Sequence, residues 1–314
     1  MKKKFWKITL GTLIVLLVGA DLGGAYYLFN FAFKKGGYSS RGSDASETST
    51  QRWARQQKQE RWTQTSFDGL KMKARYYPAP QPTKKTIVVV HGYGDNSLTV
   101  GQYSQLFHEA GYNVLTPDGR AAGMSQGKYL GYGWQDRDDL AWWIKQVQKR
   151  QGPQGEIGLY GLSMGAAEVM YYLGLKVPKQ VKFAITDCGY ASIKGELQHE
   201  LQSLFHLPSF PLLPTANLFA KTIAHYDFYA ADTKKTLRQN RIPLFIIHGT
   251  KDDFVPTKHA RINYDNNHGP KKLWLVSGAK HAQSYQMQPQ KYRQKVIQWT
   301  QKYFQNEVKN HGTN

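Results

Sequence analysis

The chain has 314 residues, of which 40% are apolar and 13% aromatic, one cysteine, and a net charge of +20. This composition suits one large folded domain and excludes a disordered chain, while the lone Cys188 excludes an intramolecular disulfide and a zinc site built on several cysteines. Such a basic protein suits an anionic lipid or an anionic wall polymer as partner. No nucleic acid is expected as a partner, because no recognisable nucleic-acid-reading motif accompanies the charge.

Residues 1–35 are predicted to form a signal-anchor or transmembrane segment. Four lysines precede an apolar run over residues 8–33, in which Asp21 is the single charged residue. A run of this length exceeds the ~20 residues that span a bilayer, and Tyr26 and Tyr27 suit one interface. We favour an uncleaved, single-pass anchor in the cell membrane, with the rest of the chain outside the cell. The alternative is cleavage after Ala20, which would release a secreted protein.

Residues 36–60 are rich in Gly, Ser, Thr and Gln and are expected to form a flexible tether to a domain over residues 61–314. That domain begins with a predicted hairpin around Asp68-Gly69. Short apolar runs then alternate with helical patterns such as residues 135–150. The runs predict strands at residues 86–91, 113–118, 156–161, 181–187, 242–248 and 271–278. We expect an α/β fold with a mostly parallel sheet and helices on both faces.

Ser163 is the predicted nucleophile. It lies in Gly161-Leu162-Ser163-Met164-Gly165, between a predicted strand and a helix that begins with small residues. A serine in this position occupies a tight, strained turn, and flanking glycines relieve the steric conflict with the neighbouring strand and helix.

A serine nucleophile needs a base, and the base needs a carboxylate that orients it. His281 follows the last predicted strand, and Asp252 and Asp253 follow the strand before it. We expect His281 to be the base, and either Asp252 or Asp253 to be the carboxylate that orients it. Asp187 is expected to be structural.

The turn His91-Gly92-Tyr93-Gly94 follows the first strand of the parallel sheet. We expect the backbone N–H groups of Tyr93 and Met164 to form an oxyanion hole, and His91 to be a structural hydrogen-bonding residue. Asp118 and Arg120 are expected to pair with each other.

Several motifs in order resemble the bacterial α/β-hydrolases of the serine-aminopeptidase-like and carboxylesterase groups. They are HGYGD (91–95), DGRAAGMSQG (118–127), GLSMG (161–165), DCGYAS (187–192), HGTKDDFVP (248–256) and GAKH (278–281). The resemblance covers about residues 61–304 and implies an α/β-hydrolase fold in which the first Asp of HGTKDDFVP, Asp252, serves as the acid. The chain departs from the common DxRGHG form at residues 118–123, and Cys188 stands where serine is common.

A helical cap is expected at about residues 193–241, where proline and apolar residues replace a simple crossover helix. Two roles stay open for its apolar side chains, which either line an acyl pocket or pack the cap onto the domain: Leu204, Phe205, Leu207, Phe210, Leu212 and Leu213. The predicted activity is hydrolysis of carboxylic esters through an acyl-enzyme, without cofactor or metal. The alternatives are a serine peptidase or acyltransferase on the same triad, and an inactive surface-binding domain. A peptidase needs an acidic site for the peptide amine, and the acidic residues of the cap are dispersed along the sequence.

Overall fold

The computed structural model describes residues 2–37 and 46–304. Within them, eight strands form one sheet in the order β1-β2-β4-β3-β5-β6-β7-β8. Their bounds are β1 Glu60–Thr65, β2 Lys71–Tyr77, β3 Lys85–Val90, β4 Asn113–Pro117, β5 Glu156–Leu162, β6 Val181–Asp187, β7 Leu244–Gly249 and β8 Lys271–Val276. The strands from β3 to β8 run parallel, and β1 and β2 form the antiparallel hairpin predicted around Gly69, whose φ is +86°.

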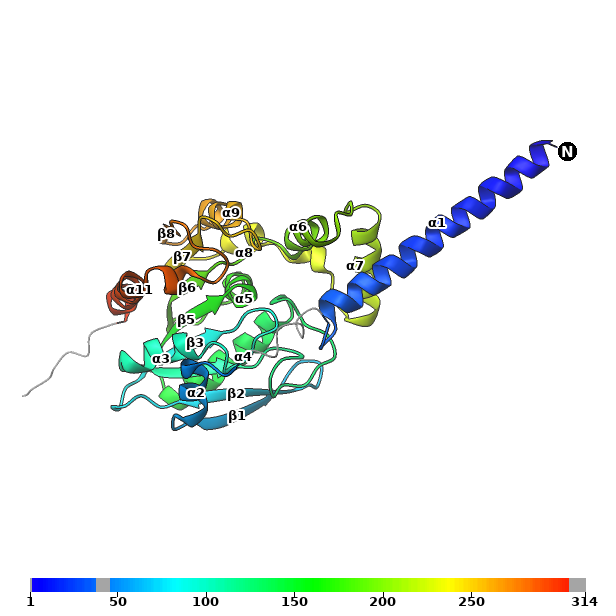
Figure 1. The fold of residues 1–314 in the computed structure, drawn as a ribbon. Coiled ribbons are helices and arrows are strands. Elements are labelled where there is room, and N and C mark those ends of the chain that lie inside the picture. The colour runs from blue at the N-terminus through cyan, green and yellow to red at the C-terminus, as the bar shows by residue number, and fades with distance from the viewer. Residues whose placement is uncertain (1, 38–45, 305–314) are drawn as a thin grey trace, which may run out of the picture.

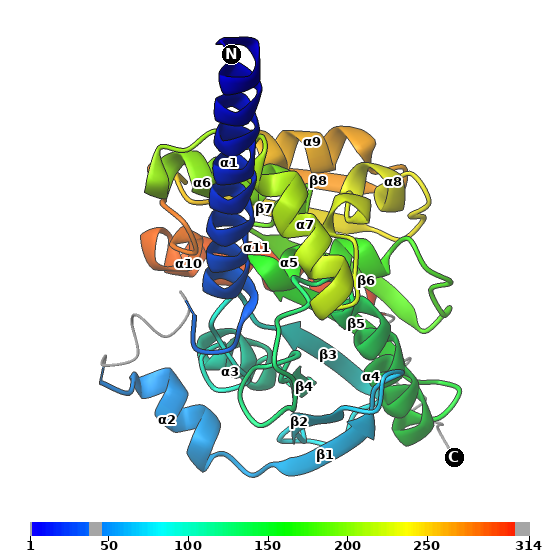
Figure 2. The ribbon, with the colours of Figure 1, turned by 90° about the vertical axis from the view of Figure 1, so that its right-hand side faces the viewer.

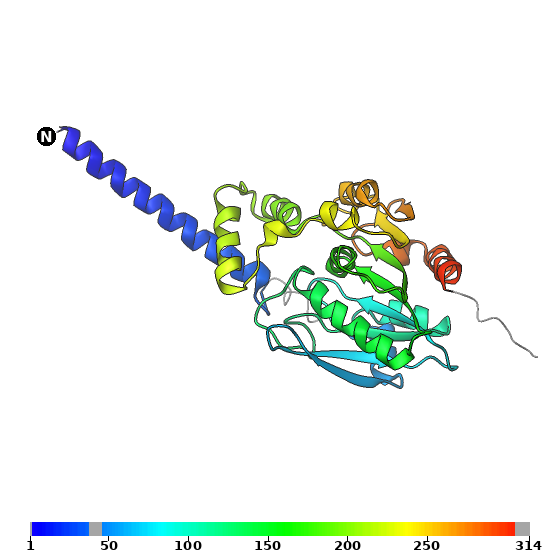
Figure 3. The same ribbon diagram turned by 180° about the vertical axis from the view of Figure 1, so that it is seen from behind.

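Helices cover both faces of the sheet, as Figures 1 and 3 show. Alternate residues of β3 explain this, because Ile87 and Val89 enter one apolar cluster while Val88 and Val90 enter another. The first cluster includes residues of α2 (Ser49–Gln56), α3 (Gly101–Glu109) and α11 (Pro289–Tyr303). The second includes α4 (Asp136–Gln151), α5 (Met164–Tyr172), α8 (Thr233–Leu237) and α9 (Lys258–Asn266). The expected α/β architecture is therefore confirmed.

The segment predicted to be the cap lies over the carboxyl ends of the strands. It contains α6 (Ile193–Phe205), α7 (Leu212–Ile223) and the short helix η2 (Phe228–Ala230). Buried side chains of α6 and α7 join a third apolar cluster with Tyr132 and Met164 of the main domain. The cap thus packs directly above the elbow that follows β5.

Helix α1 (Lys2–Phe33) is the most extended element and projects from the cap (Figure 1). Figure 2 shows its last part lying across α7. Thr9–Phe33 is long and apolar enough to cross a membrane. The described side chains up to Ala20 are exposed, whereas Ala25, Phe29 and Phe33 are buried against the domain. The helix therefore has a free half and a docked half.

The segment predicted to be a flexible tether differs from expectation in its second half. Residues 38–45 lie outside the described residues, but Ser49–Gln56 forms α2. Thr48 caps this helix in a capping box with Gln51, and Ala54 is fully buried and accepts a 3.0 Å hydrogen bond from the Tyr77 hydroxyl. A good N-cap and one apolar face are enough to fold this polar segment onto the domain.

Candidate active site

Ser163 occupies a strained turn between β5 and α5. Its φ is +53° and its ψ is −115°, a conformation that non-glycine residues adopt at an energetic cost. The neighbouring glycines are required by space, because a Cβ at Gly161 would lie 2.3 Å from the Gly165 carbonyl oxygen and a Cβ at Gly165 2.4 Å from that of Val90. The turn holds the serine side chain at the carboxyl edge of the sheet.

Ser163, His281 and Asp252 meet in a line of hydrogen bonds. Ser163 Oγ lies 2.9 Å from His281 Nε2, and His281 Nδ1 lies 2.9 Å from Asp252 Oδ2. The three residues come from the turns after β5, β8 and β7. Among the described residues, the carboxylate that bonds His281 is that of Asp252 and not that of Asp253. The backbone oxygen of Asp253 accepts a 2.7 Å hydrogen bond from His199 Nε2.

The Asp252 carboxylate is held in its ionised form. Burial alone would raise its pKa, but hydrogen bonds with His248 and His281 lower the pKa to about 2. Its Oδ1 also accepts hydrogen bonds from the backbone N–H groups of Phe254 (3.2 Å) and Val255 (2.9 Å). A fixed negative charge therefore lies beside His281 Nδ1, which favours the tautomer with a proton on Nδ1 and a free lone pair on Nε2 toward the serine.

His248 is a part of this arrangement that the sequence did not reveal. Its Nε2 donates to the Val255 carbonyl oxygen at 2.8 Å and lies 3.2 Å from Asp252 Oδ2. The side chain is completely buried at the end of β7. Its spacing of four residues from Asp252 was the available signal, but that spacing indicates contact only on a helix, and this segment is a strand followed by a turn.

Asp187 and Cys188 lie near the serine with structural roles. Asp187 is buried and accepts hydrogen bonds from the hydroxyls of Ser284 (3.1 Å) and Tyr292 (2.9 Å), and burial raises its pKa to about 6. Cys188 Sγ lies 3.9 Å from His281 Nε2, and burial raises the pKa of its thiol well above the usual value. The thiol therefore stays protonated near neutral pH and is a poor nucleophile.

The two backbone groups expected to form an oxyanion hole flank the serine. Met164 is the first residue of α5, where N–H groups have no partner within the helix. A Cβ added to Gly92 would lie 3.4 Å from Ser163 Cβ, so the Gly92-Tyr93 turn approaches the serine closely. His91 Nε2 accepts a 2.8 Å hydrogen bond from the backbone N–H of Gly119, which fits the structural role expected for it.

The expected ion pair between Asp118 and Arg120 is not formed. Arg120 pairs with Asp139 at 2.8 Å and with Asp68 at 2.6 Å. Asp118 accepts hydrogen bonds from the backbone N–H groups of Ser97 (2.6 Å) and of Met124 (2.9 Å). The two side chains thus stabilise the same loop through different partners, because the chain turns between them.

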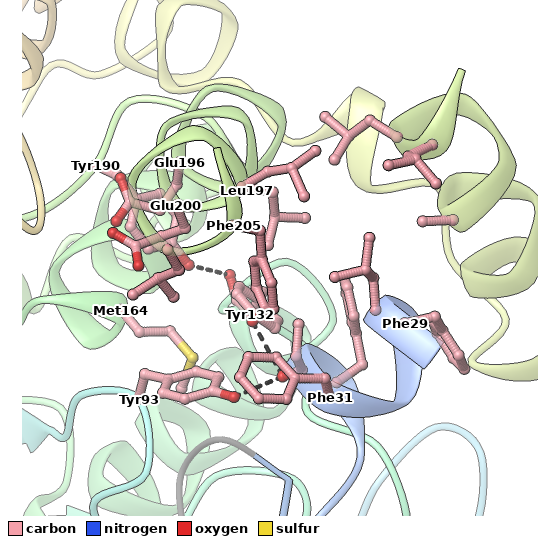
Figure 4. Close-up of a pocket in the computed structure, with 18 of the residues that line it drawn as sticks. Phe29, Phe31, Tyr93, Tyr132, Met164, Tyr190, Glu196, Leu197, Glu200 and Phe205 are labelled. Carbon is pink, nitrogen blue, oxygen red and sulfur yellow. Dashed lines mark hydrogen bonds between the residues drawn. The ribbon is translucent and has the colours of Figure 1, made fainter. Parts of the chain in front are cut away.

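Ser163 lines an apolar pocket, other walls of which are shown in Figure 4. The space between its walls is about 860 Å³, which includes solvent at its open mouth. Four of the six apolar cap residues considered from the sequence line it: Leu204, Phe205, Leu212 and Leu213. Leu207 and Phe210 do not, and are exposed. The docked half of α1 supplies a wall that the sequence did not predict: Leu28, Phe29, Phe31, Ala32 and Phe33.

Two acidic side chains also face this pocket. Glu196 and Glu200, one turn apart on α6, both line it, so the acidic residues of the cap are less dispersed in space than in sequence. Burial raises the pKa of Glu196 well above its usual value and also raises that of Glu200. Neither oxygen of Glu196 has a hydrogen-bond partner among the described residues.

Among the described residues, Cys188, Asp252 and His281 are the group whose donor atoms lie close enough to hold a metal ion. Two of these donors already have other partners, because Asp252 bonds His281 and His281 faces Ser163. The third is a buried, protonated thiol. This donor set fits the serine arrangement better than it fits a metal centre.

The family model that matches, described as serine aminopeptidase S33, aligns with residues 81–222. The uncharacterized protein YqkD of Bacillus subtilis is 34% identical over 221 residues, which cover 70% of this chain and 72% of that protein.

Among solved structures, the esterase Pf2001 of Pyrococcus furiosus has 21% identity and a TM-score of 0.67, covering 83% of this chain and 96% of that one. An esterase from Exiguobacterium antarcticum has 19% identity and a TM-score of 0.56, covering 76% and 98%. At these identities the likeness shows the fold alone. Together with the family match and the bacterial relative, it shows that the chain belongs to the α/β-hydrolase family, in its serine-aminopeptidase-like group.

Proposed function

We propose that this protein is a membrane-anchored serine esterase that cleaves carboxylic esters with an apolar acyl group. The observation that carries the proposal is the continuous line from Ser163 Oγ through His281 to Asp252, with 2.9 Å at each step, ending in an apolar pocket. This is the geometry that activates a hydroxyl at neutral pH.

In the acylation step, Ser163 Oγ attacks the ester carbonyl carbon while His281 Nε2 takes the hydroxyl proton. The imidazolium that forms is stabilised by the ionised Asp252. The backbone N–H groups of Tyr93 and Met164 receive the negative charge that develops on the carbonyl oxygen, each contributing roughly 3 kcal/mol to transition-state stabilisation. His281 then gives its proton to the leaving alcohol, and the acyl group remains on Ser163.

In the deacylation step, water attacks the acyl carbon and His281 takes one of its protons. Collapse of the second tetrahedral intermediate breaks the bond to Ser163 Oγ, which recovers its proton from His281, and the carboxylic acid leaves. An acceptor alcohol in place of water would make the same machinery an acyltransferase. The pocket is lined by Phe and Leu side chains, so we expect it to bind the acyl chain of the substrate and not a polar group.

The location follows from α1. Thr9–Phe33 is long and apolar enough to span a bilayer, and lysines precede it in the sequence, so we place the N-terminus inside and the hydrolase domain outside. Cleavage after Ala20 would remove the free half of α1 and leave the docked half, because the docked half begins at Asp21. Carbonate extraction of membranes separates the two cases: an uncleaved anchor stays in the pellet, and a cleaved protein is released.

A peptidase is the second candidate, and the observation that favours it is the pair of carboxyl groups on α6. Glu196 and Glu200 face the pocket, where they could bind the ammonium group of a peptide. The raised pKa of Glu196 argues against this, because burial disfavours the negative charge that would bind an ammonium group.

Kinetics with matched substrates test the choice. We expect the full chain in detergent to hydrolyse p-nitrophenyl butyrate, and Ser163→Ala to lose this activity by at least about a thousandfold. Aminoacyl anilides should be poor substrates. Anilide hydrolysis that exceeds ester hydrolysis and is lost in Glu200→Gln would favour the peptidase instead, and no hydrolysis of either would favour an inactive binding domain.

A further inference from the structure

Helix α1 changes its surroundings abruptly at Asp21. The described side chains before this residue are exposed, and from Asp21 onward one face of the helix packs on the cap and the loop 128–134. Tyr26 and Phe29 contact the ring of Phe219 on α7, with centroids 5.3 and 6.3 Å apart. The cap is therefore fixed to the apolar helix itself, with no flexible segment between them.

The free half of α1 is too short to cross a bilayer. From Thr9 to Ala20 it rises ~18 Å at ~1.5 Å per residue, against a hydrocarbon thickness of ~30 Å. The helix reaches ~28 Å only at Tyr27, where Tyr26 and Tyr27 supply the aromatic pair typical of a membrane interface. The helix segment from Asp21 to Tyr27, ~9 Å long, is thus both docked on the cap and inside the hydrocarbon layer.

The surface at this depth is suited to lipid. On the docked helix, Leu22, Tyr26 and Tyr27 are exposed, although the Tyr26 ring also contacts Phe219 of α7. On the adjoining cap, Phe210 is 76% exposed, and Leu207 and Leu218 are also exposed. We call these six residues the cap-tip surface. Asp21, the charged residue of the span, is turned inward, and its Oδ2 accepts a 2.6 Å hydrogen bond from the Thr215 hydroxyl on α7.

The pocket opens next to this surface. Leu204 both lines the pocket and is 44% exposed, and Leu207 follows it closely in the chain. On the opposite wall, Phe31 of α1 contacts Phe205 with ring centroids 5.4 Å apart. Figure 4 shows Phe31 and Phe205 beside each other in the pocket that Met164, the neighbour of Ser163, also lines. An acyl chain that enters beside Leu204 can therefore follow the apolar side chains of α1 and α6 toward the serine.

From this arrangement we propose that the cap-tip surface is immersed in the outer leaflet and that the substrate is an acyl ester of a membrane lipid. The lipid's acyl chain enters the pocket between α1 and the cap directly from the bilayer. The membrane helix is then both the anchor and one wall of the acyl site. This inference rests on the proposed esterase function and adds the source of the substrate. An immersion of ~9 Å agrees with the depth of ~5–10 Å reached by interfacial helices.

Immersion can be measured on the full chain in phosphatidylcholine vesicles. Cys188 is buried, so a cysteine introduced by Phe210→Cys can be labelled selectively with an environment-sensitive fluorophore. The matched control is Trp142→Cys on α4, an exposed apolar position (49%) away from α1. We expect blue-shifted emission and quenching by spin-labelled lipids at position 210 and neither at position 142. Equal, water-like emission at both positions would overturn the immersion.

The substrate claim is tested with two esters. Phe210→Asp combined with Leu207→Asp should lower hydrolysis of a long-chain diacylglycerol ester embedded in vesicles by at least tenfold, while p-nitrophenyl acetate hydrolysis in solution stays within twofold. Trp142→Asp should change neither. Equal rates of lipid hydrolysis in the double variant and wild type would overturn lateral entry. A wild-type protein that hydrolyses p-nitrophenyl acetate but not the lipid would also overturn it. If the wild-type protein does not hydrolyse p-nitrophenyl acetate, the esterase function itself is refuted.

Discussion

The docking of α1 predicts that a single aromatic side chain on this helix controls substrate selection. Phe29 is completely buried on α1 and contacts Phe33, Tyr129 and Phe219, with ring centroids 5.2, 5.2 and 6.3 Å apart. Phe29→Ala removes these contacts and leaves a cavity between the helix and the cap. The matched control is Tyr27→Ala, an exposed aromatic residue on the same helix.

Replacing a buried Phe by Ala costs about 3–5 kcal/mol. Because about 1.4 kcal/mol corresponds to a tenfold change in an equilibrium constant, the docking equilibrium of α1 falls by at least roughly two orders of magnitude. The triad should be spared, since Ser163, His281 and Asp252 come from turns after β5, β8 and β7. The pocket wall formed by Leu28 and Phe31 should be disturbed, because both residues lie on α1.

Steady-state kinetics in detergent micelles with p-nitrophenyl esters from acetate to dodecanoate provide the assay. For Phe29→Ala we expect KM to rise at least tenfold for the long esters and less than threefold for acetate, with a lower midpoint of thermal unfolding. Tyr27→Ala should behave like wild type in both respects. If Phe29→Ala leaves the dependence of KM on chain length unchanged, α1 does not form a wall of the acyl pocket that contacts substrate.

Three further predictions concern polar groups. Asp252→Asn should lower kcat by roughly 10³–10⁴ because it removes the charge that supports His281, while Asp253→Asn should leave kcat within about twofold; equal losses would contradict the assignment. His248→Leu, which removes a buried donor near Asp252, should lower kcat about tenfold with little change in KM, and His248→Gln should recover part of it. Burial raises the pKa of Asp187 in the folded state to about 6. Its protonated carboxyl therefore contributes its whole stabilisation of the fold at a pH below its usual pKa, and this contribution is lost as the pH rises through about 6. Chemical unfolding should therefore show wild type losing about 3 kcal/mol between about pH 4 and about pH 7 relative to Asp187→Asn; parallel pH profiles would refute this.

Much of the fold was predictable because its signals are local. Continuous apolar runs mark strands buried on both faces, and the Asp68-Gly69 pair marks the first hairpin. The meeting of Ser163, His281 and Asp252 was also predictable, since turns after parallel strands converge on one edge of the sheet.

The features that the sequence did not reveal depend on packing between distant segments. Nothing near Phe29 indicates that half of an apolar helix docks on a cap almost two hundred residues later. The predicted pairing of Arg120 with Asp118, the closest acidic residue in sequence, is wrong because Asp139 and Asp68 approach Arg120 in space. The contact of His248 with Asp252 likewise arises from the turn after β7 and not from any recognisable spacing.

Covalent labelling of the serine tests the central claim most directly. The full chain in detergent is treated with a fluorophosphonate probe, and the modified residue is mapped by mass spectrometry. We expect a single adduct on Ser163, which is absent in Ser163→Ala and forms much more slowly in His281→Ala. An unlabelled wild-type protein, or labelling that persists in Ser163→Ala, would contradict it.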